Sequence, residues 1–232
     1  MAINVEFLKN PIDPDSQVSF PYYYDGDNKE TAKLKIMFIG NSITFHERID
    51  AIGWHKNCGM AASDLDHDYV HVVYHRLKEK YGKVAMCVFN GATWERDYLN
   101  QDKLNLIIKT AKDFAPDIII IRIGENFNKP MLKDGIDPFP AFDGLLKGCL
   151  GVSKNISISS MFWAHPILDE AITKAANINK CNYFLLSDLG ADRKYLAYEQ
   201  YNNSAGYCGH PGDYGMEVIA ERVLNEISKL GF

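Results

Sequence analysis

The amino-acid sequence predicts an α/β fold, in which a five-stranded parallel sheet is covered by helices on both faces. Two observations support this prediction. Five short apolar segments, rich in β-branched and aromatic residues, alternate with longer segments of helical periodicity, and such alternation is typical of parallel sheets. The short segments are also apolar at successive positions, as expected for strands that are buried on both faces.

Each expected strand ends at glycine or at polar residues. The first, Leu-Lys-Ile-Met-Phe-Ile, stops at Gly40, and the third, Asp-Ile-Ile-Ile-Ile-Arg-Ile, is the clearest buried strand in the sequence. The expected strands are residues 34–39, 84–89, 117–123, 156–163 and 183–187.

The expected helices carry apolar residues at helical spacing between recognisable ends. The first stops at Gly82, the second is closed by Pro116, and the last begins at Asp213, which is expected to cap it. Core candidates on the first two helices are Val70, Val73, Tyr74, Leu77, Leu99, Leu106, Ile107 and Ala111. The expected helices are residues 68–81, 99–114, 142–150, 167–179 and 213–230.

The chain is predicted to form one domain over residues 34–232, because it has no internal repeat and no linker. Residues 1–33 lack periodicity and are predicted to be an extension packed on this domain, anchored by residues 20–24. Residues 46–68 form a long irregular segment. Such loops inside a compact domain are usually functional, so we expect this one to cover the edge where the first strand ends.

Composition excludes several classes of function. The net charge of −5 gives no reason to expect nucleic acid as a partner, and no apolar run is long enough to span a membrane. The five cysteines form no Cys-x-x-Cys pair, and the acidic residues 64–68 are interpreted as a helix start, so no metal or cofactor is expected. The N-terminus lacks the features of a signal peptide, which predicts a cytoplasmic protein, or a secreted or periplasmic one if a leader has been removed.

Polar residues follow the expected strands at the points where the strands end. Carboxyl ends of parallel strands meet at one edge of a sheet, where ligands bind in open α/β folds. A short Gly-x-Ser pattern is weak alone, and it lacks the second glycine of the Gly-x-Ser-x-Gly elbow. Groups distant in sequence that gather at one edge are nevertheless what nucleophilic catalysis needs, and Ser42 is the first candidate nucleophile. The residues concerned are Asn41, Ser42, Asn90, Gly91, Gly124, Asn126 and His165, together with His210 and Pro211 before the last helix.

Four of these blocks, taken in order, resemble the SGNH (GDSL-like) hydrolase family. They are Gly-Asn-Ser-Ile-Thr at 40–44, Gly91, Gly-Glu-Asn at 124–126, and the His-Pro pair at 210–211. The resemblance extends from residue 33 to the end of the chain. It implies a flavodoxin-like three-layer sandwich and hydrolysis of an ester by a serine.

The resemblance also implies roles for individual residues. Ser42 would attack the acyl carbon, and His210 would act as general base and then as general acid. The oxyanion would be held by the backbone N–H of Ser42, the backbone N–H of Gly91 and the side-chain amide of Asn126. Candidate substrate-binding residues at the same edge are Asn41, Trp94, Glu95 and His165, although His165 fits a hydrogen-bonded turn equally well.

Two positions depart from the family pattern. The family usually has an acid three residues before the histidine, where this chain has Tyr207. Either a backbone carbonyl, Tyr207 or a remote acid orients His210, or the protein is slow or inactive. In the second block, the family's glycine corresponds either to Gly91 or to Glu95.

The leading hypothesis is therefore a serine hydrolase of a small acyl or acetyl ester. Aromatic residues such as Trp94 and Trp163 favour a carbohydrate ester slightly over a long acyl chain. One alternative is a binding protein of the same fold that lost catalysis with the acid before His210. The other is an acyltransferase that passes the acyl group to a sugar.

Overall fold

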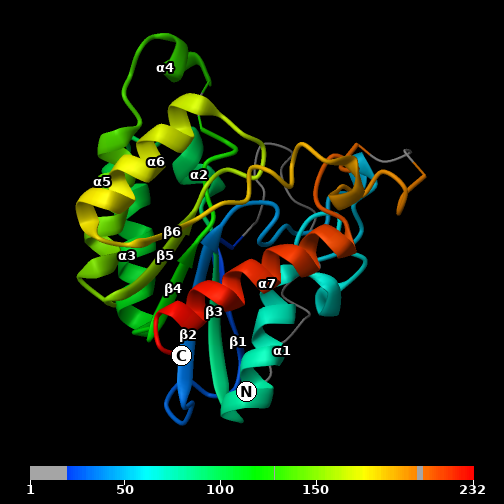
Figure 1. Ribbon diagram of the computed structural model, residues 1–232, viewed down its shortest axis with the longest axis vertical. Coiled ribbons are helices and arrows are strands. Elements are labelled where there is room, and N and C mark those ends of the chain that lie inside the picture. The colour runs from blue at the N-terminus through cyan, green and yellow to red at the C-terminus, as the bar shows by residue number, and fades with distance from the viewer. Residues whose placement is uncertain (1–19, 128, 203–205) are drawn as a thin grey trace.

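The computed structural model describes residues 20–127, 129–202 and 206–232, so most of the predicted N-terminal extension lies outside the described residues. The sheet has strand order β1-β3-β2-β4-β5-β6 (Figure 1). Five strands are parallel, as predicted. They are β2 (Leu34–Gly40), β3 (Val84–Asn90), β4 (Ile118–Ile121), β5 (Asn155–Ser159) and β6 (Asn182–Phe184).

The predicted strand count was one too low. Strand β1 (Tyr22–Gly26) lies within the segment predicted to be an extension, and it pairs antiparallel with β3 at the edge of the sheet. Its five residues are all half-buried, because an edge strand has only one neighbour. The sequence Tyr-Tyr-Tyr-Asp-Gly shows neither an apolar run nor the alternation that marks a strand with one buried face.

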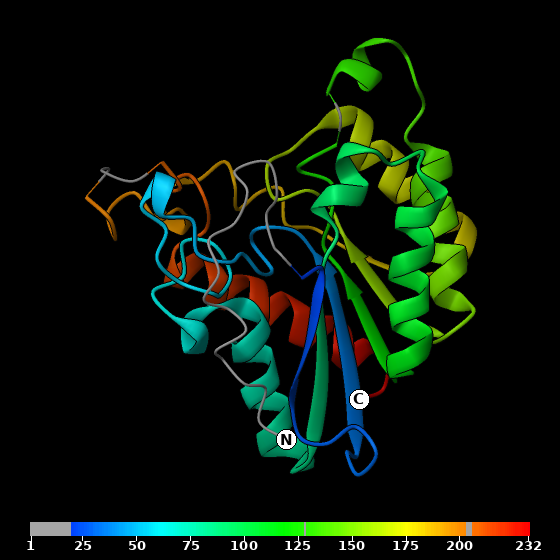
Figure 2. The same ribbon diagram turned by 180° about the vertical axis from the view of Figure 1, so that it is seen from behind.

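Helices cover both faces of the sheet, which makes the predicted three-layer sandwich. Helices α1 (Tyr69–Tyr81) and α7 (Asp213–Lys229) lie on one face (Figure 1). The opposite face is covered chiefly by α3 (Gln101–Phe114), α5 (Phe139–Leu150) and α6 (Pro166–Asn179), as the view from behind shows (Figure 2). The short helices α2 (Ala92–Arg96) and α4 (Lys129–Lys133) were not predicted.

The central strand β2 supplies both halves of the hydrophobic core. Ile36 and Phe38 pack in the cluster under α1 and α7, whereas Met37 and Ile39 pack in the cluster under α3 and α5. All four side chains are fully buried. Full burial of such a side chain contributes about 1.5–3 kcal/mol, so this strand holds the two helical layers on one rigid sheet. The strand's last residue leads directly into the candidate site.

Two details of the predicted helices were wrong. Leu99 and Leu106 are 56% and 41% exposed. Helix α3 begins at Gln101, where the side chain of Asn100 caps it, and its buried face instead includes Leu104. Asp213 does not cap α7, because its carboxylate accepts a hydrogen bond from the backbone N–H of Ser63 at 2.7 Å.

Residues 46–68 are irregular, as predicted, with two short 3₁₀ turns at Asp50–Ile52 and Leu65–His67. Bridges between His46 and Cys58 and between Ile49 and Trp54 fold the segment back on itself. The acidic cluster is a helix start, as interpreted, since the Asp68 side chain caps α1. Within the described ranges, no three His, Cys, Asp or Glu side chains gather in a metal-binding arrangement, and no helix has the length and apolarity to cross a bilayer.

Candidate active site

Ser42 lies two residues beyond the carboxyl end of β2, in a single turn of chain. The carbonyl of Asn41 accepts hydrogen bonds from the N–H groups of Thr44 and Phe45, each at 2.9 Å. This closes a turn with Ser42 at its start, where backbone N–H groups have no partner inside the turn. Ser42 is 8% exposed, so its hydroxyl is enclosed but reachable.

Gly40 is required at the end of β2 because the chain doubles back over it. A Cβ atom there would collide with the side chain of Thr44 and lie 2.9 Å from the carbonyl oxygen of Arg122. The Gly40 carbonyl also accepts a hydrogen bond from the N–H of Gly91 at 2.6 Å. The two glycines therefore join the ends of the neighbouring strands β2 and β3 directly.

His210 reaches Ser42 from the loop before α7. The Ser42 Oγ lies 3.2 Å from the His210 Nε2, although the two residues are 168 positions apart. The ring of Trp163 packs edge-on against the imidazole, with centroids 5.4 Å apart and planes at 88°. The predicted nucleophile and base therefore lie within hydrogen-bonding distance of each other.

The backbone carbonyl of Tyr207 orients His210. The His210 Nδ1 lies 3.2 Å from this oxygen, which can only accept a hydrogen bond, so Nδ1 carries the proton. The Nε2 lone pair then faces Ser42 and accepts the hydrogen bond from its hydroxyl. A carbonyl thus selects the tautomer that a triad carboxylate would select, which answers the question raised by the missing acid.

Burial keeps the imidazole neutral. Desolvation is the largest cause that lowers the pKa of His210, to about 4; His46 and the guanidinium of Arg122 lower it further, and the Tyr207 carbonyl and the charge of Glu125 oppose them. A carbonyl carries only a partial charge, so it stabilises an imidazolium less than a carboxylate does. His210 is therefore a deprotonated but weak base at neutral pH.

The side chain of Tyr207 has a packing role. Its ring makes edge contacts with Trp54 and Tyr201, each at 5.1 Å between centroids, and its hydroxyl donates to the Gly53 carbonyl at 3.4 Å. We therefore expect Tyr207→Phe to keep kcat/KM within about twofold of wild type and to lower the free energy of unfolding by about 1 kcal/mol. Ester hydrolysis and urea unfolding measure the two effects. A large loss of activity without unfolding would contradict the assignment of His210 orientation to the backbone.

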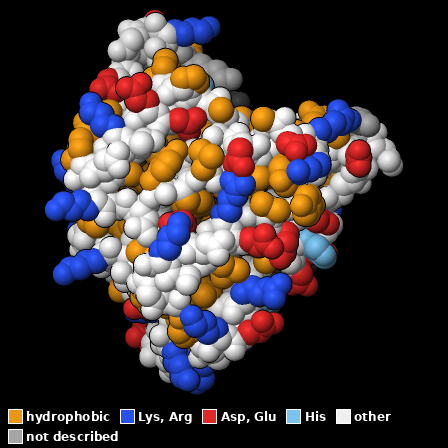
Figure 3. Space-filling model, in the orientation of Figure 1, with side chains coloured by type: hydrophobic (Ala, Val, Ile, Leu, Met, Phe, Trp, Pro, Cys, Tyr) orange, Lys and Arg blue, Asp and Glu red, His pale blue; other side chains and the backbone are white. Residues whose placement is uncertain are grey.

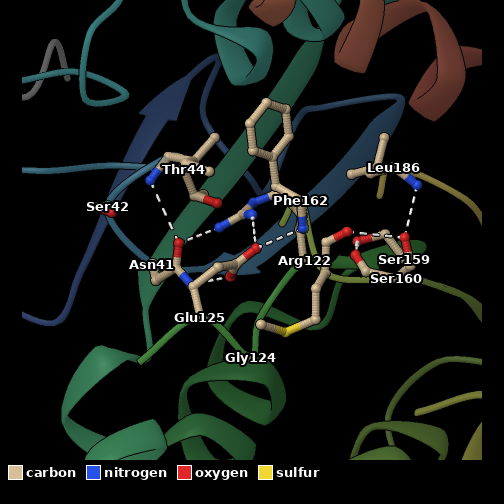
Figure 4. Close-up of polar contacts among 12 residues, drawn as sticks. Asn41, Ser42, Thr44, Arg122, Gly124, Glu125, Ser159, Ser160, Phe162 and Leu186 are labelled. Atoms are coloured by element: carbon tan, nitrogen blue, oxygen red, sulfur yellow. Dashed lines mark hydrogen bonds and ion pairs between the residues drawn. The ribbon is translucent and has the colours of Figure 1, made fainter. Parts of the chain in front are cut away.

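A network of buried polar side chains lies beneath the turn that carries Ser42 (Figure 4). The amide nitrogen of Asn41 donates to Glu95 at 3.0 Å and to Glu125 at 2.5 Å. The guanidinium of Arg122 pairs with Glu125 at 2.7 Å and donates to the Asn41 side-chain oxygen. Glu125 also accepts the N–H of Phe162 at 2.9 Å. The network therefore joins the ends of β2, β4 and β5.

The two carboxylates of this network are inequivalent. Burial, and then the negative charge of Glu125, raise the pKa of Glu95. Burial acts in the same direction on Glu125, but the charge of Arg122 and the Phe162 N–H outweigh it and lower the pKa of that carboxyl. Glu125 is thus the compensated member of the pair.

The predicted oxyanion donors differ in their surroundings. The Asn126 side-chain amide donates to the Glu95 carboxylate at 2.7 Å, and Glu95 is itself bonded to Asn41, the neighbour of Ser42. This chain of contacts holds the Asn126 amide at the same edge as Ser42. The structure does not support Gly91 as a donor, because its N–H is already bonded to Gly40.

Three of the four predicted substrate-binding residues are fully enclosed. Trp94 is 1% exposed and packs against Phe127 and Phe142 in the core. Glu95 and Asn41 are both 0% exposed and belong to the buried network. These placements correct the prediction, since an enclosed side chain has no surface to offer a substrate.

His165 is a helix cap, in agreement with the turn alternative. Its Nδ1 accepts a long hydrogen bond from the N–H of Leu168 at the start of α6. His165 also lines a cavity of about 210 Å³ together with Leu132, Lys133 and Ile167. The structure therefore gives His165 a structural role and leaves substrate contact as a prediction.

Sequence reasoning missed Arg122 and Glu125. Arg122 is 1% exposed and follows four consecutive isoleucines, a position where an unpaired charge would be costly. A lone arginine in such a run, with an acid three residues later, was the available signal for a buried ion pair. Trp163, placed beside His210, was noted in the sequence only as an aromatic residue.

Comparisons with solved structures find the same architecture. The chain resembles the psychrotrophic esterase EstA from Pseudoalteromonas (TM-score 0.57, 10% identity, covering 85% of this chain and 98% of that one). It also resembles a catalytic mutant of an acetylxylan esterase from Geobacillus stearothermophilus (TM-score 0.53, 17% identity, covering 87% of this chain and 95% of that one). A third similar structure is a family 3 carbohydrate esterase from Clostridium thermocellum (TM-score 0.54, 19% identity, covering 85% of this chain and 96% of that one).

Sequence comparison adds nothing to this, since no family model and no curated protein matches the chain. At 10–19% identity the structural likeness establishes the fold. The chain thus has the fold of the SGNH (GDSL-like) esterases that its motifs predicted.

Proposed function

We propose that this protein is a serine ester hydrolase in which Ser42 and His210 form a catalytic dyad. The observation that carries the proposal is the line of contacts from the Ser42 hydroxyl to the His210 Nε2, and from the His210 Nδ1 to the Tyr207 carbonyl, each 3.2 Å long. A nucleophile, a base and a group that orients the base are the components of serine catalysis.

In the acylation step, the Ser42 oxygen attacks the acyl carbon while its proton moves to the His210 Nε2. The resulting imidazolium keeps its Nδ1–H on the Tyr207 carbonyl and gives the Nε2 proton to the leaving alcohol. In deacylation a water molecule attacks the acyl-serine, His210 accepts its proton, and Ser42 leaves as the regenerated hydroxyl.

Negative charge develops on the acyl oxygen in both steps. The N–H of Ser42 and the side-chain amide of Asn126 are the donors that we assign to it, because Ser42 lies at the start of the turn after β2 and Asn126 lies in the segment that follows β4. Such donors act on the transition state more than on the substrate, and loss of one typically costs roughly 10²–10³ in rate.

The preferred substrate class is a small acyl ester, with acetylated carbohydrate favoured. Two of the structurally similar proteins are described as an acetylxylan esterase and a carbohydrate esterase. The aromatic ring of Trp163 beside His210 suits the apolar face of a sugar. The surface is also hollowed above the carboxyl ends of the strands, between the part that carries α4 and the loops before α7 (Figure 3), which suits an acetyl group on a bulky alcohol.

A fluorophosphonate probe and acetyl-ester hydrolysis together test this proposal. The probe is expected to label the wild type once, at Ser42, and Ser42→Ala is expected to remove both labelling and hydrolysis. A wild type that neither reacts nor hydrolyses between about pH 4 and 9 would favour the binding-protein alternative. Product analysis with acceptor sugars present identifies an acyltransferase, which would yield acylated sugar in place of free acid.

A further inference from the structure

Glu95 is a carboxylate buried beneath the proposed site and held by neutral donors. It is 0% exposed. One oxygen accepts the side-chain amide of Asn41 at 3.0 Å and the backbone N–H groups of Gly124 and Asn126. The other oxygen accepts the side-chain amide of Asn126 at 2.7 Å. One carboxylate oxygen thus binds the side-chain amide of Asn41, the neighbour of Ser42, and the other binds that of Asn126.

We propose that Glu95 is a positioning residue, which holds the Asn126 amide in the orientation that stabilises the oxyanion. The inference rests on the proposed function of the site. It gives Glu95 a role in place of the substrate contact that the sequence suggested.

The chemistry of a primary amide explains why such a group is needed. The oxygen and nitrogen of an asparagine side chain are nearly equal in shape, so packing alone does not decide which of them faces a given point. A carboxylate only accepts hydrogen bonds, so it binds the nitrogen side of Asn126 and rejects the oxygen side. One N–H is then fixed on Glu95, and the other N–H of the same nitrogen is the one that the proposed function assigns to the oxyanion.

The energetic cost of Glu95 supports a functional role. Glu125 in the same network is compensated by the guanidinium of Arg122 at 2.7 Å, whereas the four contacts of Glu95 described above come from neutral N–H groups. Burying a carboxylate is expensive, and an apolar residue of similar size often serves packing equally well. We therefore explain the acid at this position by the orientation that it imposes on the side-chain amide of Asn126.

Glu95→Gln provides a test in which size is retained. One oxygen of Glu95 accepts three donors and the other accepts one, so the glutamine oxygen is expected to take the place with three donors. Its amide nitrogen then faces Asn126 and turns that side chain over, so that the Asn126 oxygen replaces the nitrogen. We expect kcat to fall by roughly 10²-fold, as for the loss of one oxyanion donor, with little change in KM.

A double-mutant cycle separates positioning from general support of the fold. Asn126→Ala alone is expected to cost about as much as Glu95→Gln, and the double variant is expected to be no slower than Asn126→Ala alone, because Glu95 acts only through that amide. If the fold-losses in kcat of the two single variants multiplied in the double variant, the proposal would be overturned. Glu226→Gln is the matched control, since Glu226 is 3% exposed and pairs with Lys229 on α7; it should leave kcat unchanged.

A spectroscopic measurement decides the inference without reference to catalysis. The side-chain amide signals of Asn126, assigned by their loss in Asn126→Ala, are expected to include one proton shifted downfield by the carboxylate, and this shift should disappear in Glu95→Gln. Asn126 signals that are unchanged in Glu95→Gln would overturn the inference. Failure of the proposed function is seen separately, as absence of hydrolysis and of Ser42 labelling in the wild type.

Discussion

Replacement of His210 by alanine is expected to lower kcat/KM for an acetyl ester by roughly 10³-fold, within the range attributed to general acid–base catalysis. The imidazole accepts the proton of Ser42 through a contact of 3.2 Å. Without the imidazole, the Ser42 hydroxyl must attack the ester while it still carries its proton, or it must give the proton to water. The loss should appear in kcat more than in KM, because the ring acts in proton transfer.

His75→Ala is the control for this measurement. His75 is exposed on α1 and its ring pairs with Asp66 at 3.2 Å, so its removal should leave hydrolysis as it is in the wild type. Circular dichroism establishes that both variants are folded. A His210→Ala protein that is folded and hydrolyses the ester at the wild-type rate would remove the imidazole from the mechanism.

Replacement of Arg122 by methionine is expected to destabilise the protein by about 3–5 kcal/mol. The guanidinium is 1% exposed and the carboxylate of Glu125 that it binds is 7% exposed. Methionine fills much of the space but leaves Glu125 as an uncompensated buried charge. Urea unfolding monitored by tryptophan fluorescence measures the change.

Two further variants test whether the uncompensated charge of Glu125 causes the loss of stability in Arg122→Met. Lys147→Met removes an exposed pair with Asp143, also 2.7 Å long, and should cost at most about 1 kcal/mol. Adding Glu125→Gln to Arg122→Met should recover part of the stability, because the pair is then removed as a unit. If Arg122→Met and Lys147→Met lowered the free energy of unfolding equally, burial of the Arg122–Glu125 pair would contribute nothing to its effect on stability.

The sequence was sufficient for the parallel strands and for the pairing of Ser42 with His210. The first prediction depends on local features, namely apolar runs that stop at glycine or polar residues, whereas the second was implied by the resemblance of the blocks at 40–44, 124–126 and 210–211 to the SGNH family. The topology of a parallel sheet brings such ends together. Distance along the chain was therefore no obstacle, although 168 positions separate the two residues.

Other parts of the site depend on geometry that a residue pattern does not encode. The orientation of His210 comes from a backbone carbonyl, which every residue possesses, so no side chain at 207 could reveal it. The Gly91 N–H was predicted to be an oxyanion donor, but Gly40 ends β2, Gly91 follows the paired strand β3, and the Gly91 N–H bonds to the Gly40 carbonyl. Strand β1 went unpredicted because its pairing with β3, at the edge of the sheet, leaves no periodic pattern.

Charged residues inside the fold were the least predictable elements. Glu95 lies in a segment with several polar neighbours, and acids of this kind are almost always on the surface. Its burial results from the close approach of α2 to the segments that follow β2 and β4. N–H groups of Asn41, Gly124 and Asn126 there surround the carboxylate.

The pH dependence of kcat/KM tests the dyad most directly, because it reports the ionisation of the base in the free enzyme. The pKa of His210 is lowered to about 4 by burial, and a general base acts when deprotonated. Activity should therefore be constant at neutral pH and fall only as the pH drops through about 4. Burial also lowers the pKa of His46 to about 4, so His46→Gln is the control. The activity of this variant should still fall only at acidic pH, as in the wild type. A loss of activity that begins near pH 6.5, the ordinary value of an exposed histidine, would contradict a buried imidazole oriented by a backbone carbonyl.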